Sequence, residues 1–396
     1  MPAEGPHVST RSDAPGNDDQ RIAVLKIISR TLRRKDLTPE DNYLALCHDL
    51  RRTIVIIREI ERRFAVQLPL TLLMEAETIS AIADAVVSRV IPASRGMVTL
   101  KPAEPASSLP PLFVFPGIGG AVMELADIAH AINYAGPIYG LPYPGLDGHA
   151  KPSPTIAPLA EESWKRIKSV QPTGPYFLLG YSAGGYVALE TARLIEADRQ
   201  HVGLLGIVEA GIHERFWPFG KWLTFMIGRM RQQRGKRPST DTVTPTDEEA
   251  ARKAAGPSRA RLLKKAAAIG QKLGRIRTRI GHRYGNPLRP GYAASSPYYI
   301  GNLPSLLQSV RDMSIVLLAS YKFRAYHGRT IYFRSETGDP LSCDPETMWR
   351  RVLPDILFEQ LPGDHASMIA PPHAQMLAAR ISRYLPRPQD QADRNG

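Results

Sequence analysis

The stretch Gly180-Tyr181-Ser182-Ala183-Gly184 decides how this 396-residue chain should fold. An apolar run, residues 176–179, precedes it, and a helix-like segment, residues 186–196, follows it. A serine between glycines on a sharp strand-to-helix turn can present its hydroxyl above a sheet, and the tightness of that turn requires small residues on both sides. The sequence therefore predicts a strand, a turn that carries a nucleophile at Ser182, and a helix.

A serine nucleophile needs a histidine base later in the chain. Among the histidines after Ser182, only His365 lies where a loop would follow a strand, since residues 358–361 are strand-like and residues 374–384 are helix-like. We therefore expect His365 to be the general base, and the alternative is a solvated loop histidine. The remaining candidates are interpreted as surface or helix-capping residues: His213, His282, His327 and His373.

A glycine-rich turn is a candidate oxyanion hole. The short apolar strand at residues 112–115 ends in Pro116-Gly117-Ile118-Gly119-Gly120. Such a turn lets backbone N–H groups point at developing negative charge without side-chain obstruction. We expect the amides of Ile118 and Ala183 to be the two donors. A nucleotide-binding loop is the alternative, but the segment lacks the Lys-Ser/Thr of a P-loop.

Two carboxylates compete for the role of the acid that orients the histidine. Glu209 closes the apolar run at residues 202–208, and Asp339 follows the strand-like residues 330–334. Either could stabilise an imidazolium. Gly-Asp-Pro is also ordinary turn chemistry, so the sequence favours Glu209 and keeps Asp339 as the alternative.

Residues 97–388 resemble the thioesterase domains that end polyketide and nonribosomal peptide assembly lines. The resemblance rests on Phe115-Pro116-Gly117, on the serine turn through Gly185, and on Gly363-Asp364-His365. It implies an α/β-hydrolase sheet with a helical lid at about residues 213–320, and it places the acid at Glu209. The family usually has aspartate there, so the extra methylene of Glu209 leaves the identity of the acid open.

The front of the chain resembles an acyl or peptidyl carrier domain over residues 20–90, a small all-α four-helix bundle. Residues 21–30 have the pattern of a first helix, and residues 54–64 have apolar positions at helical spacing. Counting from either end of this pattern places Leu50 where a carrier has the serine that takes phosphopantetheine. Leucine has no hydroxyl, so the resemblance implies no cofactor on this chain and a phosphopantetheine-bound substrate supplied by a partner carrier.

The remaining composition fits a two-domain cytoplasmic enzyme. Residues 1–19 are polar and are expected to be a disordered tail, because they lack the apolar core of a signal peptide. Residues 91–111 are interpreted as a linker that includes a first edge strand at residues 98–100. No apolar run approaches the length of a membrane span. The two cysteines, Cys47 and Cys343, argue against a disulfide framework, and no metal site is expected.

The net charge of +13 is concentrated in the predicted lid. Residues 213–290 hold 19 Lys+Arg against 5 Asp+Glu, whereas the rest of the chain is nearly balanced. A basic lid could attract an acidic carrier protein. Alternatively, the aromatic residues 216–222 could make peripheral contact with an anionic membrane. No nucleic-acid-binding module accompanies the charge, and nucleic acid is not an expected partner.

Together these features predict a serine thioesterase of secondary-metabolite biosynthesis that releases an acyl or peptidyl chain by hydrolysis or cyclisation. The alternatives are an acyltransferase or an esterase on the same three residues, and a non-catalytic docking protein.

Overall fold

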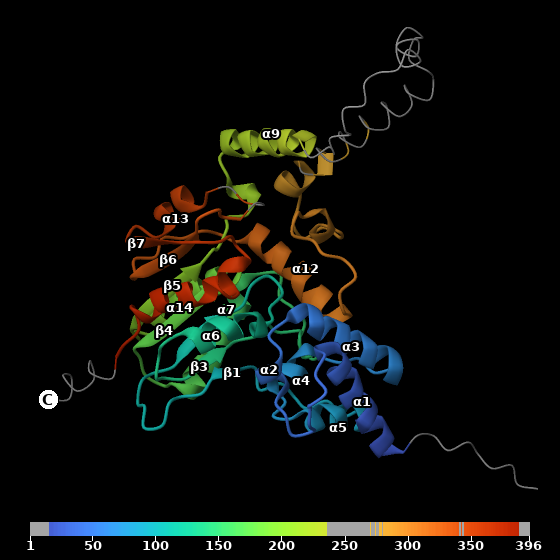
Figure 1. The fold of residues 1–396 in the computed structure, drawn as a ribbon. Coiled ribbons are helices and arrows are strands. Elements are labelled where there is room, and N and C mark those ends of the chain that lie inside the picture. The colour runs from blue at the N-terminus through green and yellow to red at the C-terminus, as the bar shows by residue number, and fades with distance from the viewer. Residues whose placement is uncertain are drawn as a thin grey trace, which may run out of the picture.

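The computed structural model describes residues 16–235, 270, 274, 277–278, 280–339, 342 and 344–387. Within them, a helical N-terminal domain is followed by an α/β domain (Figure 1). Of the predicted tail, residues 1–15 lie outside the described part. The first helix begins at Asn17, three residues before the predicted start of the domain.

The N-terminal domain has three longer helices and two short ones. They are α1 (Asn17–Leu32), α2 (Tyr43–Leu46), α3 (Leu50–Phe64), α4 (Leu70–Glu75) and α5 (Ile79–Ser88). Helix α3 buries Thr53, Ile56, Ile57 and Ile60, which recur at helical spacing on one face. Asp49 caps α3, because its carboxylate accepts the N–H of Arg51 at 2.8 Å. Helix α1 packs against α3 and α5, as the predicted carrier-like bundle requires.

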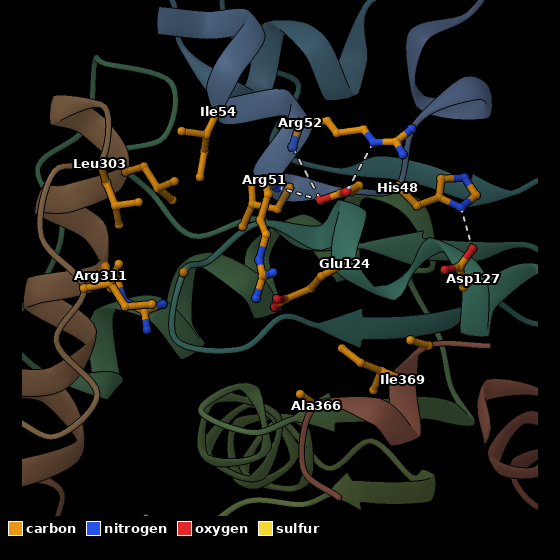
Figure 2. Close-up of a pocket in the computed structure, with 16 residues that line it drawn as sticks. His48, Arg51, Arg52, Ile54, Glu124, Asp127, Leu303, Arg311, Ala366 and Ile369 are labelled. Atoms are coloured by element: carbon orange, nitrogen blue, oxygen red, sulfur yellow. Dashed lines mark hydrogen bonds and ion pairs between the residues drawn. The ribbon is translucent and has the colours of Figure 1, made fainter. Parts of the chain in front are cut away.

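The N-terminal domain lies against the α/β domain at the start of α3 and at the loop after it. His48 Nδ1 is 2.7 Å from Asp127 Oδ1, an interaction drawn in Figure 2. The amide of Gln67 donates to the hydroxyl of Ser305 at 2.8 Å. These two contacts turn the first residues of α3 toward the α/β domain.

The α/β domain is built on a seven-stranded sheet with the order β1-β3-β2-β4-β5-β6-β7. Its strands are β1 (Val98–Lys101), β2 (Leu112–Phe115), β3 (Ile138–Gly140), β4 (Tyr176–Tyr181), β5 (Val202–Val208), β6 (Thr330–Ser335) and β7 (Ile356–Leu361). Only β1, the predicted edge strand, runs antiparallel to its neighbour. The others are parallel, so their carboxyl ends and the loops that follow meet at one edge of the sheet.

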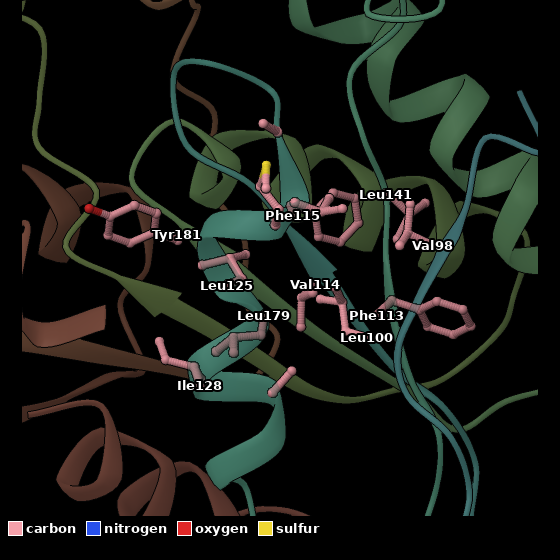
Figure 3. Close-up of a cluster of buried hydrophobic side chains, with 14 of the residues drawn as sticks. Val98, Leu100, Phe113, Val114, Phe115, Leu125, Ile128, Leu141, Leu179 and Tyr181 are labelled. Atoms are coloured by element: carbon pink, nitrogen blue, oxygen red, sulfur yellow. The ribbon is translucent and has the colours of Figure 1, made fainter. Parts of the chain in front are cut away.

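Helices cover both faces of this sheet, which confirms the predicted α/β class (Figure 1). Helices α7 (Ile156–Val170) and α8 (Gly184–Ala197) pack against each other, as do α6 (Ala126–Ala131) and α14 (His373–Ser382). Figure 3 shows side chains of β2 and β4 packed with those of α6 and of the 3-10 helix η1 (Val122–Leu125). Every residue of β2 and of its neighbour β4 is buried, so these two strands lie in the core of the domain.

The predicted lid region begins with η2 (Glu214–Phe216) and α9 (Phe219–Gly235), and ends with η3 (Ala293–Ser295) and α12 (Ser305–Ser320). Residues 236–269, which hold much of its positive charge, lie outside the described part. The base of the lid is tied together by Glu214, whose carboxylate is 2.6 Å from His282 Nδ1. The prediction that His213 and His282 are surface residues is wrong, because both are buried.

The aromatic segment of the lid also differs from the expectation of a free surface. Trp217 and Trp222 are buried, with Trp217 donating to the carbonyl of Ile212 at 2.6 Å. Phe219 remains exposed. None of the helices in the described ranges is long and apolar enough to cross a bilayer. Contact between the lid and a membrane surface stays a prediction.

A small helix, α13 (Glu346–Val352), links β6 to β7.

Replacement of Gly180 or Gly184 by alanine should destabilise the α/β domain. A methyl group at either position would lie under 3.0 Å from backbone atoms, which cannot swing aside as a side chain can. We expect a loss of about 2 kcal/mol or more in the free energy of unfolding, measured by thermal or urea denaturation. Gly220→Ala is the matched control, since no atom lies within 4 Å of the added methyl group. Equal stability of Gly184→Ala and the control would contradict this packing argument.

Candidate active site

Ser182 lies in the tight turn between β4 and α8 with a left-handed backbone (φ 52°). Its N–H donates to the carbonyl of Val208 at 2.8 Å. Gly184 packs directly on the backbone of Phe115 and Pro116. A non-glycine residue in this conformation costs free energy and persists only where the surroundings impose it, which is a feature of functional sites. The turn holds Ser182 at the carboxyl edge of the sheet.

His365 follows β7 and lines the same cavity as Ser182, which has a volume of about 330 Å³. The ring of His365 is stacked on Tyr181, with ring centroids 5.2 Å apart. The Tyr181 hydroxyl donates to the His365 carbonyl at 2.9 Å. The turn is held by the carboxylate of Asp364, which accepts the N–H groups of Ala366 and Ser367. The structure thus brings Ser182 and His365 into one cavity.

Glu209 lies at the end of β5, also with positive φ (47°). One carboxylate oxygen accepts the N–H of Ser335 at the end of β6. The other is 3.9 Å from Nδ1 of His365, which is within the range of an ion pair but beyond that of a hydrogen bond. In the described part of the chain, Nδ1 of His365 is buried without a hydrogen-bond partner. Glu209 is therefore held so that its free oxygen faces the ring.

Asp339, the alternative acid, lies after β6 and also lines the cavity. Its carboxylate accepts the hydroxyl of Tyr298, which lies in the lid, at 2.6 Å. The charge of Asp339 also acts on His365 and helps to raise its pKa. The two candidates differ in their contacts: Glu209 lies within ion-pair range of His365, and Asp339 accepts a hydrogen bond from the lid residue Tyr298. The choice of Glu209 as the acid stays a prediction.

The histidine has a raised pKa. Burial works to lower the pKa of His365, but interactions with the carboxylates of Glu209, Asp339 and Glu124 outweigh it and raise the pKa above its usual value of 6.5. A base in this environment favours the imidazolium that forms after proton abstraction. It is also protonated, and therefore inactive as a base, over a wider range of pH.

Ile118 and Ala183, whose amides are the predicted oxyanion donors, both line the cavity. Neither backbone N–H donates to a protein acceptor in the described chain. The loop that carries Ile118 is fixed by Glu124, whose carboxylate accepts the N–H of Gly117 at 2.8 Å. Burial raises the pKa of Glu124. The arrangement leaves the two amides available for a negatively charged oxygen.

Sequence reasoning missed Glu124 and Arg311. Arg311 projects from α12 and donates to the carbonyl of Tyr298 at 2.9 Å, and burial lowers its pKa. Together with Ala366 it lines both the 330 Å³ cavity and a larger one of about 760 Å³. No local motif marks either residue. For Glu124, the sequence signal was a carboxylate that follows shortly after the glycine-rich turn.

The start of α3 offers no hydroxyl for a phosphopantetheine. Leu50 is its first residue and is half-buried, and the capping residue before it is Asp49. The side chains of Cys47 and Thr53 are buried in the helical domain, where the Thr53 hydroxyl is 2.7 Å from that of Tyr43. The residues present at this position do not fit covalent attachment.

Comparison with known proteins identifies relatives of both domains. Residues 110–254 match the family model described as a thioesterase domain, and residues 23–86 match that of the phosphopantetheine attachment site. Indigoidine synthase of Streptomyces lavendulae is 30% identical over 208 residues, which are 52% of this chain and 16% of the relative. A dimodular nonribosomal peptide synthase of Bacillus subtilis (strain 168) is 28% identical over 171 residues, 43% of this chain and 7% of the relative. The chain thus spans less than a fifth of these relatives.

A solved structure shares the fold. A four-domain nonribosomal peptide synthetase in its holo form, bound to AMP and glycine, matches with a TM-score of 0.51 and 18% identity. The match covers 97% of this chain and 27% of that chain. At this identity the likeness concerns the fold alone.

Labelling by a serine-reactive fluorophosphonate should occur at Ser182 and should accelerate as the pH rises. His365 accepts the serine proton only when neutral, so the labelling rate should rise with a midpoint above pH 6.5. Glu209→Gln removes an interaction that raises this pKa and should shift the midpoint down. Labelling is followed by mass spectrometry of the tryptic peptide at a series of pH values. A rate that is flat from pH 5 to 9, or that survives His365→Ala, would contradict the role given to His365.

Proposed function

We propose that this chain cleaves an acyl thioester through an acyl-serine intermediate. Its residues 110–254 match the thioesterase domain family, and a phosphopantetheine-attachment-type domain precedes them. The observation that supports this most is the cavity shared by Ser182, His365 and the two residues with unoccupied amides. These are the parts that acyl transfer needs: a nucleophile, a base, and donors for a developing oxyanion.

The reaction begins when His365 takes the proton of Ser182 and the serine oxygen attacks the thioester carbonyl. The amides of Ile118 and Ala183 stabilise the tetrahedral oxyanion, each by about 3 kcal/mol. The carbon–sulfur bond then breaks, and the thiol leaves with the proton held by His365. An acyl-Ser182 ester remains.

The second half of the reaction releases the acyl group. A water molecule, or a hydroxyl or amine of the acyl chain itself, gives its proton to His365 and attacks the ester. The bond between the acyl carbon and the Ser182 oxygen then breaks, and Ser182 takes the proton from His365, which regenerates the enzyme. Water yields a free acid, and an internal nucleophile yields a lactone or lactam. Glu209 acts as the acid that orients the ring and stabilises the imidazolium. Its distance of 3.9 Å from Nδ1 is compatible with this role, since such contacts commonly tighten when substrate binds.

In this proposal the thioester arm comes from another molecule, because Leu50 at the start of α3 offers no hydroxyl for covalent attachment. The phosphopantetheine-attachment-type domain supplies a carrier-like fold, but Leu50 and Asp49 occupy the start of α3. The relatives named above are synthases, which supports a separate carrier protein as a partner, with the acyl chain delivered in a biosynthetic assembly. Steering of an acidic carrier by the basic lid is a part of this proposal.

Turnover of an acyl pantetheine thioester should depend on Ser182 and on Glu209 more than on Asp339. Glu209→Gln should lower kcat by on the order of 10³-fold, because the imidazolium loses its charged partner, and Asp339→Asn by less than about tenfold. Thiol release is measured with a chromogenic reagent, and the folding of each variant by thermal denaturation.

A collapse of turnover in Asp339→Asn alone would make Asp339 the acid. An oxygen ester of the same acyl group separates the remaining alternatives. Faster cleavage of the ester than of the thioester would favour an esterase. Unchanged turnover in Ser182→Ala, or no phosphonate adduct at Ser182, would favour a docking protein.

Incubation with a phosphopantetheinyl transferase and coenzyme A should leave the mass of the intact protein unchanged. The reason is the absence of a hydroxyl at the start of α3, where Leu50 stands. A carrier domain with its serine is included as a positive control for the transferase. A mass gain that maps to residues 47–53 would contradict the argument about Leu50.

A further inference from the structure

The larger cavity is lined by residues of both domains and lies next to the catalytic one, with which it shares two lining residues. Its volume is about 760 Å³, and the start of α3 forms one wall, with Leu50 and Ile54 among the lining residues. Leu303 and Leu307, at the start of the lid helix α12, form another wall. At the inner end it shares Arg311 and Ala366 with the cavity that holds Ser182. A chain-like ligand in it would therefore run from the start of α3 toward the nucleophile.

Most charged residues of this cavity have at least one partner within the protein, although Nε2 of His48 and Nε of Arg311 are buried without a hydrogen-bond partner in the described chain. His48 is paired with Asp127 at 2.7 Å. Asp49 caps α3 and lies 3.5 Å from Arg52. Glu124 and Arg311 each have a backbone partner, as described above.

Arg51 differs from the other charged residues of the lining. Among the described residues, its guanidinium has no hydrogen bond or ion pair, although the residue is next to Leu50 and lines the cavity. Figure 2 shows its side chain extending from the start of α3 into the cavity, toward Glu124 on the opposite side. An unpaired guanidinium at the mouth of a mainly apolar cavity is suited to bind a phosphate.

We propose that this cavity binds the phosphopantetheine arm of the substrate non-covalently, and that Arg51 contacts the phosphate of the arm. This inference rests on the proposed function, whose thioester it describes further. The carrier-like domain is then a fixed wall of the substrate site. Its cationic residue stands beside the position where an active carrier would hold the same phosphate through a covalent bond.

The chemistry of the arm matches the walls. Pantetheine is a flexible chain with apolar segments and two amides, which Leu50, Ile54 and Leu307 could cover and Glu124 and Arg311 could bind. The phosphate at the far end of the arm is negatively charged and would give Arg51 an anionic partner. Coenzyme A thioesters and the arm of a separate carrier share this group, so both are possible sources of the ligand.

The test compares thioesters of one acyl group on four thiols: N-acetylcysteamine, pantetheine, coenzyme A and a separate holo carrier protein. The value of kcat/KM should rise at least about tenfold from the N-acetylcysteamine thioester to the pantetheine thioester. It should rise again from pantetheine to coenzyme A and the holo carrier, which contain the phosphate, because charge-assisted contacts to a phosphate add binding free energy. Arg51→Gln should remove the second gain and leave the rate on N-acetylcysteamine thioester unchanged. Arg58→Gln, an exposed arginine of the same helix that lies outside the cavity, is the charge-matched control.

A second variant tests the cavity itself. Leu50→Trp should fill it and slow every thioester with a full arm, again without an effect on the N-acetylcysteamine thioester. If Arg51→Gln loses the increase in kcat/KM that the phosphate gives, the site is supported. The substrate that shows this loss, coenzyme A thioester or carrier thioester, identifies the source of the arm. An unchanged phosphate gain in Arg51→Gln with both sources, or equal losses on all thioesters, would overturn the proposal. Absence of turnover on all thioesters in the unmodified protein would instead refute the proposed function.

Discussion

The backbones of β2, β4 and α8 approach so closely around Ser182 that neither Gly180 nor Gly184 has room for a methyl group. This contact forces the positive φ of Ser182 and fixes its side chain at the edge of the sheet. It also sets the N-terminus of α8 beside the glycine-rich turn after β2, so that the residues carrying the two unoccupied amides line the cavity of the serine. The proposed chemistry depends on this one piece of backbone packing.

The parallel sheet places the other candidate site residues at the same edge as Ser182. Loops after β6 and β7 bring Asp339 and His365 to one cavity, and Glu209, at the end of β5, lies 3.9 Å from the His365 ring. The lid closes it from the other side through Arg311 and Tyr298. The helical domain adds a further wall, held by the His48–Asp127 pair and by the Gln67–Ser305 hydrogen bond. In our proposal the substrate site draws on residues from both domains, and the carrier-like fold has a role that needs no attached cofactor.

The parts that sequence reasoning predicted are those set by local chemistry. The glycines around Ser182, the turn before His365 and the helical spacing of α3 are readable because each is a short-range requirement. Glu124, Arg311 and the buried His213 and His282 were missed or misplaced, since their roles arise from packing between segments distant in the chain. The choice between Glu209 and Asp339 stayed open in the sequence for the same reason, because both follow parallel strands and both carboxylates act on His365 in the folded chain. The interdomain cavity has no sequence signal beyond the substitution at Leu50.

The covalent intermediate tests the central claim most directly. The protein is mixed with an acyl pantetheine thioester for less than one turnover, quenched in acid, digested and examined by mass spectrometry. We predict an acyl group on the peptide that contains Ser182, present in the unmodified protein and absent from His365→Ala. Thiol release without any acylated peptide, or an acyl group on a different residue, would contradict the account.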